Sequence, residues 1–293
     1  MTTALVMTTA NGSSPIRTRR TKVEIERLEE QLYDIVEEIQ PCTVRQVFYQ
    51  AVSRGIIPKT EAAYKGIVCR LLTRLRRERQ LPYQWIADTT RWMRKPASYS
   101  GVEAFFEETV DLYRRDLWRD QDAYVEVWLE KDAISGVVFP LTARWDVPLM
   151  VTRGYPSLTF VAAAADVMSR EDRPVFVYYL GDHDPSGVDI PRDLEAKLRH
   201  MAPEAEITFE VIAVTEAQIV AMDLPTRPTK KSDSRSAKFQ GESVEVDAIP
   251  PARLLYLLEE HIVQHIDAER YASLLLSEAG ERETLAQFVA AWS

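Results

Sequence analysis

The segment Gly181-Asp-His-Asp-Pro-Ser-Gly187 carries two carboxylates separated by one residue, directly after an apolar run at 175–180. The run predicts a buried strand, and Pro and Gly predict a turn into a helix. Alternate side chains at a strand end point the same way, so Asp182 and Asp184 could aim at one point. There they repel unless a cation lies between them, and Mg²⁺ suits such a pair. The alternative is that Asp, Pro and Gly serve turn geometry alone.

Glu130 is a third acid in a comparable position, at the end of an apolar run that begins at residue 123. In a parallel sheet the carboxyl ends of the strands share one edge, where ligands bind. If the two strands are neighbours, Glu130 converges with Asp182 and Asp184 to hold the metal. The alternative for Glu130 is an acid that favours the N-terminus of the next helix.

Tyr49 is a candidate nucleophile. It lies on a predicted helix with an apolar stripe formed by Val44, Phe48 and Ala51, and helical geometry places it away from that stripe, on the face of Arg45. A tyrosine oxygen can attack a phosphodiester and keep the broken end as a phosphotyrosine. Two alternatives stand: a surface tyrosine that stacks on a ligand, and one that packs against a second domain.

The elements ahead of these acids predict an α-rich winged helix-turn-helix domain. Helical patterns cover 21–39, 43–55 and 60–79, and 81–87 is predicted as a strand or turn. Residues 43–95 hold twelve Lys or Arg against three Asp or Glu, a net +9, which leaves −18 for the rest of a chain of net charge −9. This asymmetry indicates a basic docking module on an acidic body, and the alternative is a solvated basic helix. The predicted DNA contacts lie on the third helix: Lys65, Arg70, Arg74 and Arg77.

The remainder alternates strand and helix, which predicts an α/β fold with a Rossmann-like parallel sheet. Strands are expected at 123–130, 147–152, 175–180 and 207–214, and helices at 102–118, 253–266 and 271–292. Residues 225–235 are expected to form a loop or a basic flap, and 244–249 a short strand. The predicted division is a tail at 1–20, a helical domain at 21–118 and an α/β domain at 119–293.

The composition is that of a globular protein with two domains, at 293 residues and 46% hydrophobic content. No apolar run reaches the length of a membrane span. Two cysteines are too few for a disulfide scaffold, and we expect a cytoplasmic location, with association to the nucleoid if the source is bacterial.

These motifs and their order resemble the toprim family, and more narrowly the A subunit of topoisomerase VI and the meiotic double-strand-break protein. Three segments carry the resemblance beside the paired-aspartate motif at 181–187: Val44-Arg-Gln-Val-Phe-Tyr49, Leu129-Glu-Lys-Asp132 and Val151-Thr-Arg-Gly-Tyr-Pro156. It covers roughly residues 43–224, and the acidic C-terminal third matches nothing in that family's pattern.

The resemblance implies Mg²⁺-dependent cleavage of DNA strands by a homodimer, with the tyrosine of one subunit acting at the metal site of the other. Tyr49 would attack the phosphate, Arg45 would steady the developing charge, and Glu130 would also move a proton. A full topoisomerase cycle would require a separate ATPase subunit. Two alternatives stay open: a toprim nuclease that uses metal-activated water, and a DNA-binding protein without catalysis.

Overall fold

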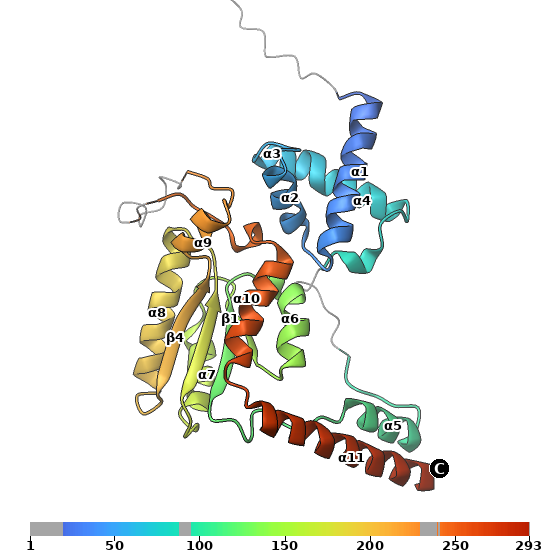
Figure 1. Cartoon of the computed structure of the whole chain (residues 1–293), viewed down its shortest axis with the longest axis vertical. Coiled ribbons are helices and arrows are strands. Elements are labelled where there is room, and N and C mark those ends of the chain that lie inside the picture. Colours follow the sequence, from blue (N-terminus) through green and yellow to red (C-terminus); the bar gives the residue numbers. More distant parts are fainter. Residues whose placement is uncertain (1–19, 88–94, 229–238, 240, 293) are drawn as a thin grey trace, which may run out of the picture.

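The computed structural model describes residues 20–87, 95–228, 239 and 241–292. Figure 1 shows a helical part at one end of the molecule, a sheet covered by helices in the middle, and a pair of helices that extends at the other end. The predicted tail therefore lies almost entirely outside the described residues, as does most of the predicted loop at 225–235.

The helical part begins with two capped helices. Thr21 and Thr43 each form a capping box, with Glu24 and Gln46 respectively. Its elements are α1 (Lys22–Ile39), α2 (Val44–Ser53), α3 (Glu61–Ala63), the π-helical η1 (Tyr64–Cys69), α4 (Arg70–Arg77) and the 3₁₀ turn η2 (Tyr83–Trp85).

The third predicted helix is a continuous helical run, α3–η1–α4, that contains a π-helical segment. The segment at 81–87 is a turn with one parallel bridge, between Cys42 and Ile86. Within residues 20–87 the structure shows no other β pairing, so a β-hairpin wing is not part of the helical part as described.

The sheet has four parallel strands in the order β2-β1-β3-β4, which confirms the α/β prediction. The strands are β1 (Tyr124–Leu129), β2 (Leu149–Val151), β3 (Val175–Leu180) and β4 (Ile207–Ala213). β1 and β3 are direct neighbours along their whole length, from Tyr124 opposite Val175 to Leu129 opposite Leu180. The neighbour relation on which the predicted acidic site depends is therefore present.

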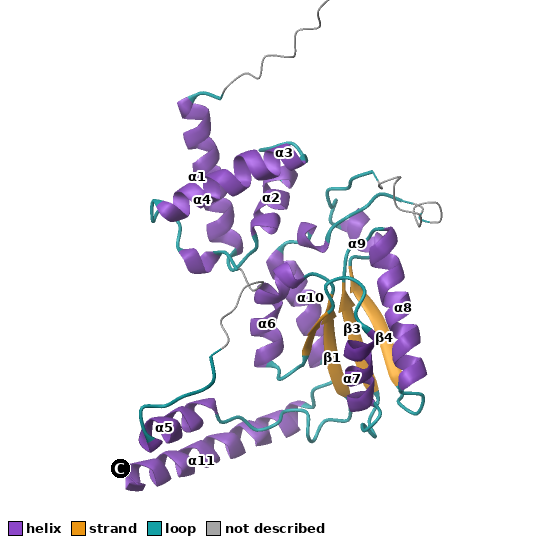
Figure 2. Cartoon of the chain, turned by 180° about the vertical axis from the view of Figure 1, so that it is seen from behind, coloured by secondary structure: helices purple, strands orange, loops and turns teal. Residues whose placement is uncertain are grey.

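Helices cover both faces of the sheet (Figure 2). One face packs against α7 (Leu158–Met168) and α8 (Pro185–Met201), and the other against α6 (Ser135–Arg144) and α10 (Pro251–Val263). The short α9 (Glu216–Ala221) follows β4. Strand side chains alternate between the two faces, so Trp128 and Tyr179 join the α7/α8 core while Leu129 and Leu180 join the α6/α10 core.

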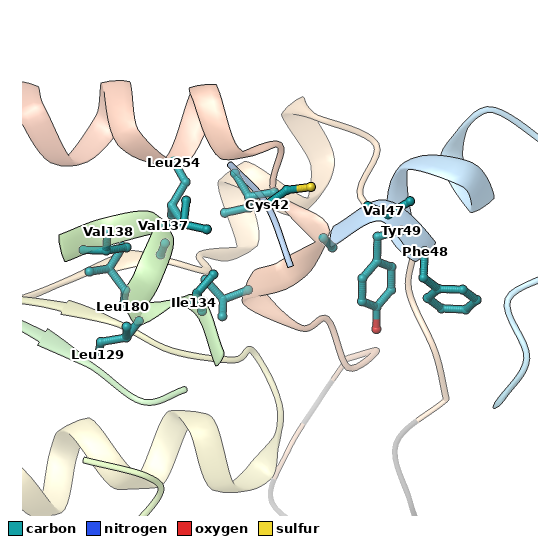
Figure 3. Close-up of a cluster of buried hydrophobic side chains, with 14 of the residues drawn as sticks. Cys42, Val47, Phe48, Tyr49, Leu129, Ile134, Val137, Val138, Leu180 and Leu254 are labelled. Carbon is teal, nitrogen blue, oxygen red and sulfur yellow. The ribbon is translucent and has the colours of Figure 1, made fainter. Parts of the chain in front are cut away.

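The α6/α10 core continues into the helical part. Figure 3 shows Leu129, Leu180, Val137 and Leu254 in one buried cluster with residues of α2 and with Cys42. The link between the two parts is the 3₁₀ turn η4 (Val246–Ala248), which packs against α2. The predicted short strand at 244–249 is wrong: only Val244 and Ser243 form isolated bridges, with His183 and Arg227.

Two helices distant in the sequence, α5 (Val102–Leu112) and α11 (Ala268–Trp292), pack side by side far from α1–α4 (Figures 1 and 2). The predicted helix at 102–118 therefore ends six residues early, and α5 accompanies the C-terminal helix rather than the helical part. None of the described helices is long and apolar enough to span a membrane.

Candidate functional site at the β1–β3 edge

The turn at 181–187 contains two glycines with no room for a side chain, Gly187 against the backbone and Gly181 against neighbouring side chains. A Cβ on Gly187 would lie 2.0 Å from the carbonyl oxygen of Asp182, and a Cβ on Gly181 would lie 2.7 Å from Glu130 Oε2. Pro185 is the first residue of α8, and Asp184 caps that helix because its Oδ1 accepts the amides of Ser186 and Gly187. Turn chemistry and the placement of acids thus coexist in one segment.

Glu130 and Asp182 lie side by side, as the sheet order requires. The Asp182 amide donates to Glu130 Oε2 at 3.0 Å, and the Glu130 amide donates to the Leu180 carbonyl at 2.9 Å. Burial, and next the negative charge of Asp182, raise the pKa of Glu130 to about 7. Two carboxylates that repel in this way form a place where a cation is favoured.

Lys131, which sequence reasoning passed over, neutralises part of this edge. Its Nζ lies 3.0 Å from Asp182, 2.9 Å from Glu245 and 3.0 Å from Asp247. Burial opposes its charge, but Asp247, Asp182 and Glu245 outweigh that effect, so the pKa of Lys131 is raised. Asp182 is further held by the Val246 amide, which donates to its Oδ1 at 2.9 Å.

Glu245 and Asp247 are also missing from the predicted site, although their signal is visible in the sequence. The run Val244-Glu-Val-Asp247 places two acids on alternate residues between apolar ones, as 182–184 does. Both are almost completely buried, at 5% and 2% exposure. Burial raises the pKa of Glu245, but the opposing effect of Lys131, Arg45 and Arg227 is larger and lowers the pKa to about 2. This acid is therefore ionised.

The three predicted ligands do not form a finished metal site. Among the residues that the structure describes, no group of three or more His, Cys, Asp or Glu side chains is arranged to hold a metal ion. Asp182 binds the Lys131 ammonium, while Asp184 caps α8 and has its Oδ2 4.0 Å from Arg227. The donor chemistry still fits Mg²⁺, because Glu130, Asp182 and Asp184 offer carboxylate oxygens only and Glu130 and Asp182 are adjacent.

Tyr49 is buried, at 1% exposure, at the junction of the helical part and η4 (Figure 3). Its ring lies under the Lys59 ammonium, 5.3 Å from the ring centroid, and its phenol interacts with Glu245. Burial and Glu245 together raise its pKa. Of the alternatives for Tyr49, packing against the second domain is the one observed. The stripe of α2 did not reveal this, because the atoms that bury Tyr49 belong to a distant segment.

Arg45 lies beside Tyr49, as its position on α2 predicted. Its guanidinium lies 3.6 Å from Glu245 and 3.6 Å from Glu61, and it stacks on the Tyr64 ring at 4.2 Å. Arg45 and Tyr49 therefore both face Glu245, so the helical part and the acidic edge of the same chain meet there. The resemblance, by contrast, implies that Tyr49 meets the acids of a partner subunit.

The four predicted DNA contacts lie on the surface of η1 and α4: Lys65, Arg70, Arg74 and Arg77 are all exposed. Lys65 pairs with Glu61 at 3.3 Å, and Arg74 binds Glu29 and lies 3.9 Å from Glu78. Part of this positive surface is therefore compensated within the chain.

The loop at 151–156 and the helix α8 flank the edge. Arg153 binds Asp132 at 2.8 Å, and the Tyr155 hydroxyl binds Asp189 at 2.5 Å. Asp189, one helical turn after the paired aspartates, also pairs with Arg192. His183, 9% exposed, pairs with Val244 through its backbone.

No protein-family model matches this sequence, and a search of the curated proteins returned no significant match.

Proposed function

We propose that this protein is a Mg²⁺-dependent DNA strand-cleaving protein of the toprim type found in the topoisomerase VI A subunit, with Tyr49 as the nucleophile. One observation carries the proposal: Tyr49 and Arg45 both contact Glu245. Lys131 in turn joins Glu245 to Asp182 of the acidic edge. A parallel sheet with neighbouring β1 and β3, preceded by a helical part with an exposed basic helix, supports the toprim and helix-turn-helix assignments.

Glu130, Asp182 and Asp184 would hold the metal. Bound Mg²⁺ supplies charge neutralisation at the scissile phosphate and its leaving oxygen. For Asp182 to take part, its carboxylate exchanges the Lys131 ammonium for the ion. Glu130 is suited to hold a proton near neutral pH, because its pKa is raised to about 7.

Tyr49 requires a movement before it acts, since a phenol with 1% exposure is closed to DNA. The helical part would separate from η4, which exposes the phenol and relieves the burial that raises its pKa. Arg45 travels with Tyr49 on α2 and would stabilise charge on the attacked phosphate. Homodimer formation and a separate ATPase subunit belong to the same proposal.

A second candidate is a nuclease in which metal-activated water attacks and Tyr49 is structural. The burial of Tyr49 and its raised pKa favour this candidate, because they make the phenol a poor nucleophile in the closed arrangement.

Incubation with supercoiled plasmid and Mg²⁺, followed by denaturation, separates the two. A covalent protein–DNA adduct that is lost in Tyr49→Phe and kept in Tyr83→Phe, an exposed tyrosine of the same helical part, supports the proposal. Cleavage that survives Tyr49→Phe but is lost in Asp184→Asn selects the nuclease. Asp189→Asn, which removes a neighbouring acid paired with Arg192, is the matched control for Asp184. Binding without cleavage under any divalent ion refutes both.

A further inference from the structure

Glu245 is a buried carboxylate on which cations from three separate segments converge. Lys131 Nζ lies 2.9 Å from Oε2, Arg227 lies 3.0 Å from Oε1, and Arg45 Nε lies 3.6 Å from Oε2. Lys131 follows β1, Arg227 follows α9, and Arg45 lies on α2. The same cations also contact other acids: Lys131 contacts Asp182 and Asp247, Arg45 contacts Glu61, and Arg227 lies 4.0 Å from Asp184. Within the part of the chain that the structure describes, Glu245 is the one carboxylate that all three share.

The position of this carboxylate is central to the proposed chemistry. Tyr49 interacts with it on the side of the helical part, and Lys131 connects it to Asp182 on the side of the acidic edge. The group between the proposed nucleophile and the proposed metal ligands is therefore an anion, held by two guanidinium groups and one ammonium. Guanidinium and ammonium groups in this arrangement are the usual partners of phosphate oxygens.

The segment that carries Glu245 lies outside the sheet. Glu245 precedes the short turn η4, and its segment is joined to the rest of the chain by isolated bridges instead of a sheet ladder. Thr43 ties the same turn to α2, because its hydroxyl donates to Asp247 Oδ1 at 3.1 Å. Displacement of the Glu245 side chain with α2 in place would leave the three cations together for another anion.

We infer that Arg45, Lys131 and Arg227 form a phosphate-binding subsite and that Glu245 occupies the place of the phosphate in the closed structure. The ligand is a phosphate group, as a DNA phosphodiester or as free inorganic phosphate. Its role as the subsite for the scissile phosphate rests on the proposed function, whereas the binding itself does not. All of its groups belong to one chain, and Glu245 is a built-in competitor for the ligand.

The test is Glu245→Gln, which keeps the shape of the side chain and removes its charge. Binding of a 20-base-pair duplex is measured by fluorescence anisotropy at several salt concentrations, and binding of inorganic phosphate by calorimetry. We expect both ligands to bind about tenfold more tightly, and the salt slope for DNA to steepen by about 0.9 for each additional phosphate that the protein neutralises. Glu242→Gln, an exposed acid of the same segment, controls for the change in net charge and should stay within about twofold of the natural protein.

The outcomes separate the inference from the proposed function. Equal affinities of folded Glu245→Gln and Glu242→Gln for both ligands overturn the subsite, even if covalent adducts form. Tighter binding of both ligands supports it, even if no adduct forms. Tighter binding of DNA alone restricts the subsite to phosphodiesters. If Glu245→Gln does not fold, Arg227→Gln decides: a salt slope reduced by about 0.9 supports the subsite, and an unchanged slope overturns it.

Discussion

Replacing Lys131 by Met tests whether one ammonium holds the acidic edge together. The ammonium is 2.9–3.0 Å from three carboxylates whose side chains are only 2–9% exposed, while Lys131 itself is 24% exposed. Met keeps most of the side-chain volume and removes the charge, so three buried acids lose their shared cation. Removal of one partner of a buried ion pair costs about 3–5 kcal/mol, and we expect a loss of about 4 kcal/mol at pH 7.

The pH dependence of the loss identifies its cause. Lys131 lowers the pKa of Glu245 and opposes the rise in the pKa of Asp182, so both pKa values are higher in the folded variant without the ammonium. Between about pH 4 and 7 the folded variant then binds more protons than the folded natural protein, so its stability relative to the natural protein falls as pH rises. The deficit of Lys131→Met should therefore be largest at pH 7 and shrink toward pH 4.

Urea denaturation at pH 4, 5, 6 and 7 measures these differences. Lys22→Met is the matched control, because Lys22 is 90% exposed, forms a pair with Glu26 at 3.6 Å, and should change stability by less than about 0.5 kcal/mol. Millimolar Mg²⁺ should restore part of the loss in Lys131→Met, since a divalent ion can replace the missing charge. A free energy of unfolding of Lys131→Met within about 1 kcal/mol of the natural protein at pH 7 would refute the reasoning, because removal of one partner of a buried ion pair costs about 3–5 kcal/mol.

Three further predictions concern the glycine turn at 181–187, the raised pKa of Glu130, and whether the site acts within one chain or between two subunits. Gly187→Ala should destabilise the protein by about 3 kcal/mol, because the added Cβ would meet a backbone oxygen. Gly66→Ala, which has open space around the added Cβ, should stabilise the protein by about 0.5–1 kcal/mol. Thermal unfolding of the two variants measures both effects. Glu130 has a pKa of about 7 in place of 4.5, so the folded state keeps a proton that the unfolded chain releases, and stability is lost as pH rises through that window. Glu130→Gln should therefore be about 3 kcal/mol more stable than the natural protein at pH 8 and equal to it at pH 4 by urea denaturation, and parallel pH profiles would contradict this. Finally, a mixture of Tyr49→Phe and Asp184→Asn chains should form no covalent adduct if both halves of the site act within one chain, whereas recovery of adduct would show that they act between subunits.

Local patterns in the sequence predicted much of the α/β part. The four strands follow from apolar runs, and both acids were expected at the carboxyl ends of strands in a parallel sheet. That the two strands are neighbours, which brings Glu130 to Asp182, is shown by the structure. The capping box at Thr43 and the turn at 181–187 were likewise readable, because capping and turn residues act over three or four positions.

The errors arose where local patterns compete with distant contacts. The segment 244–249 alternates like a strand but is a 3₁₀ turn, because η4 fits between α2 and the acidic edge instead of joining the sheet. The helix that begins at Val102 ends at Leu112, and its partner α11 lies more than 150 residues further along the chain. Neither the 3₁₀ turn at 244–249 nor the end of the helix at Leu112 can be predicted from the residues of the segment itself.

The sequence by itself therefore determined which acids follow β1 and β3, because that depends on the local strand pattern, whereas the structure showed that the two strands are neighbours. Only the tertiary structure decided what surrounds them. Lys131 meets Glu245 across 114 positions of sequence, and Tyr49 is buried by that same distant segment. Helical periodicity shows on which face of a helix a side chain lies. Its burial and charge pairing depend on every element that packs against that face.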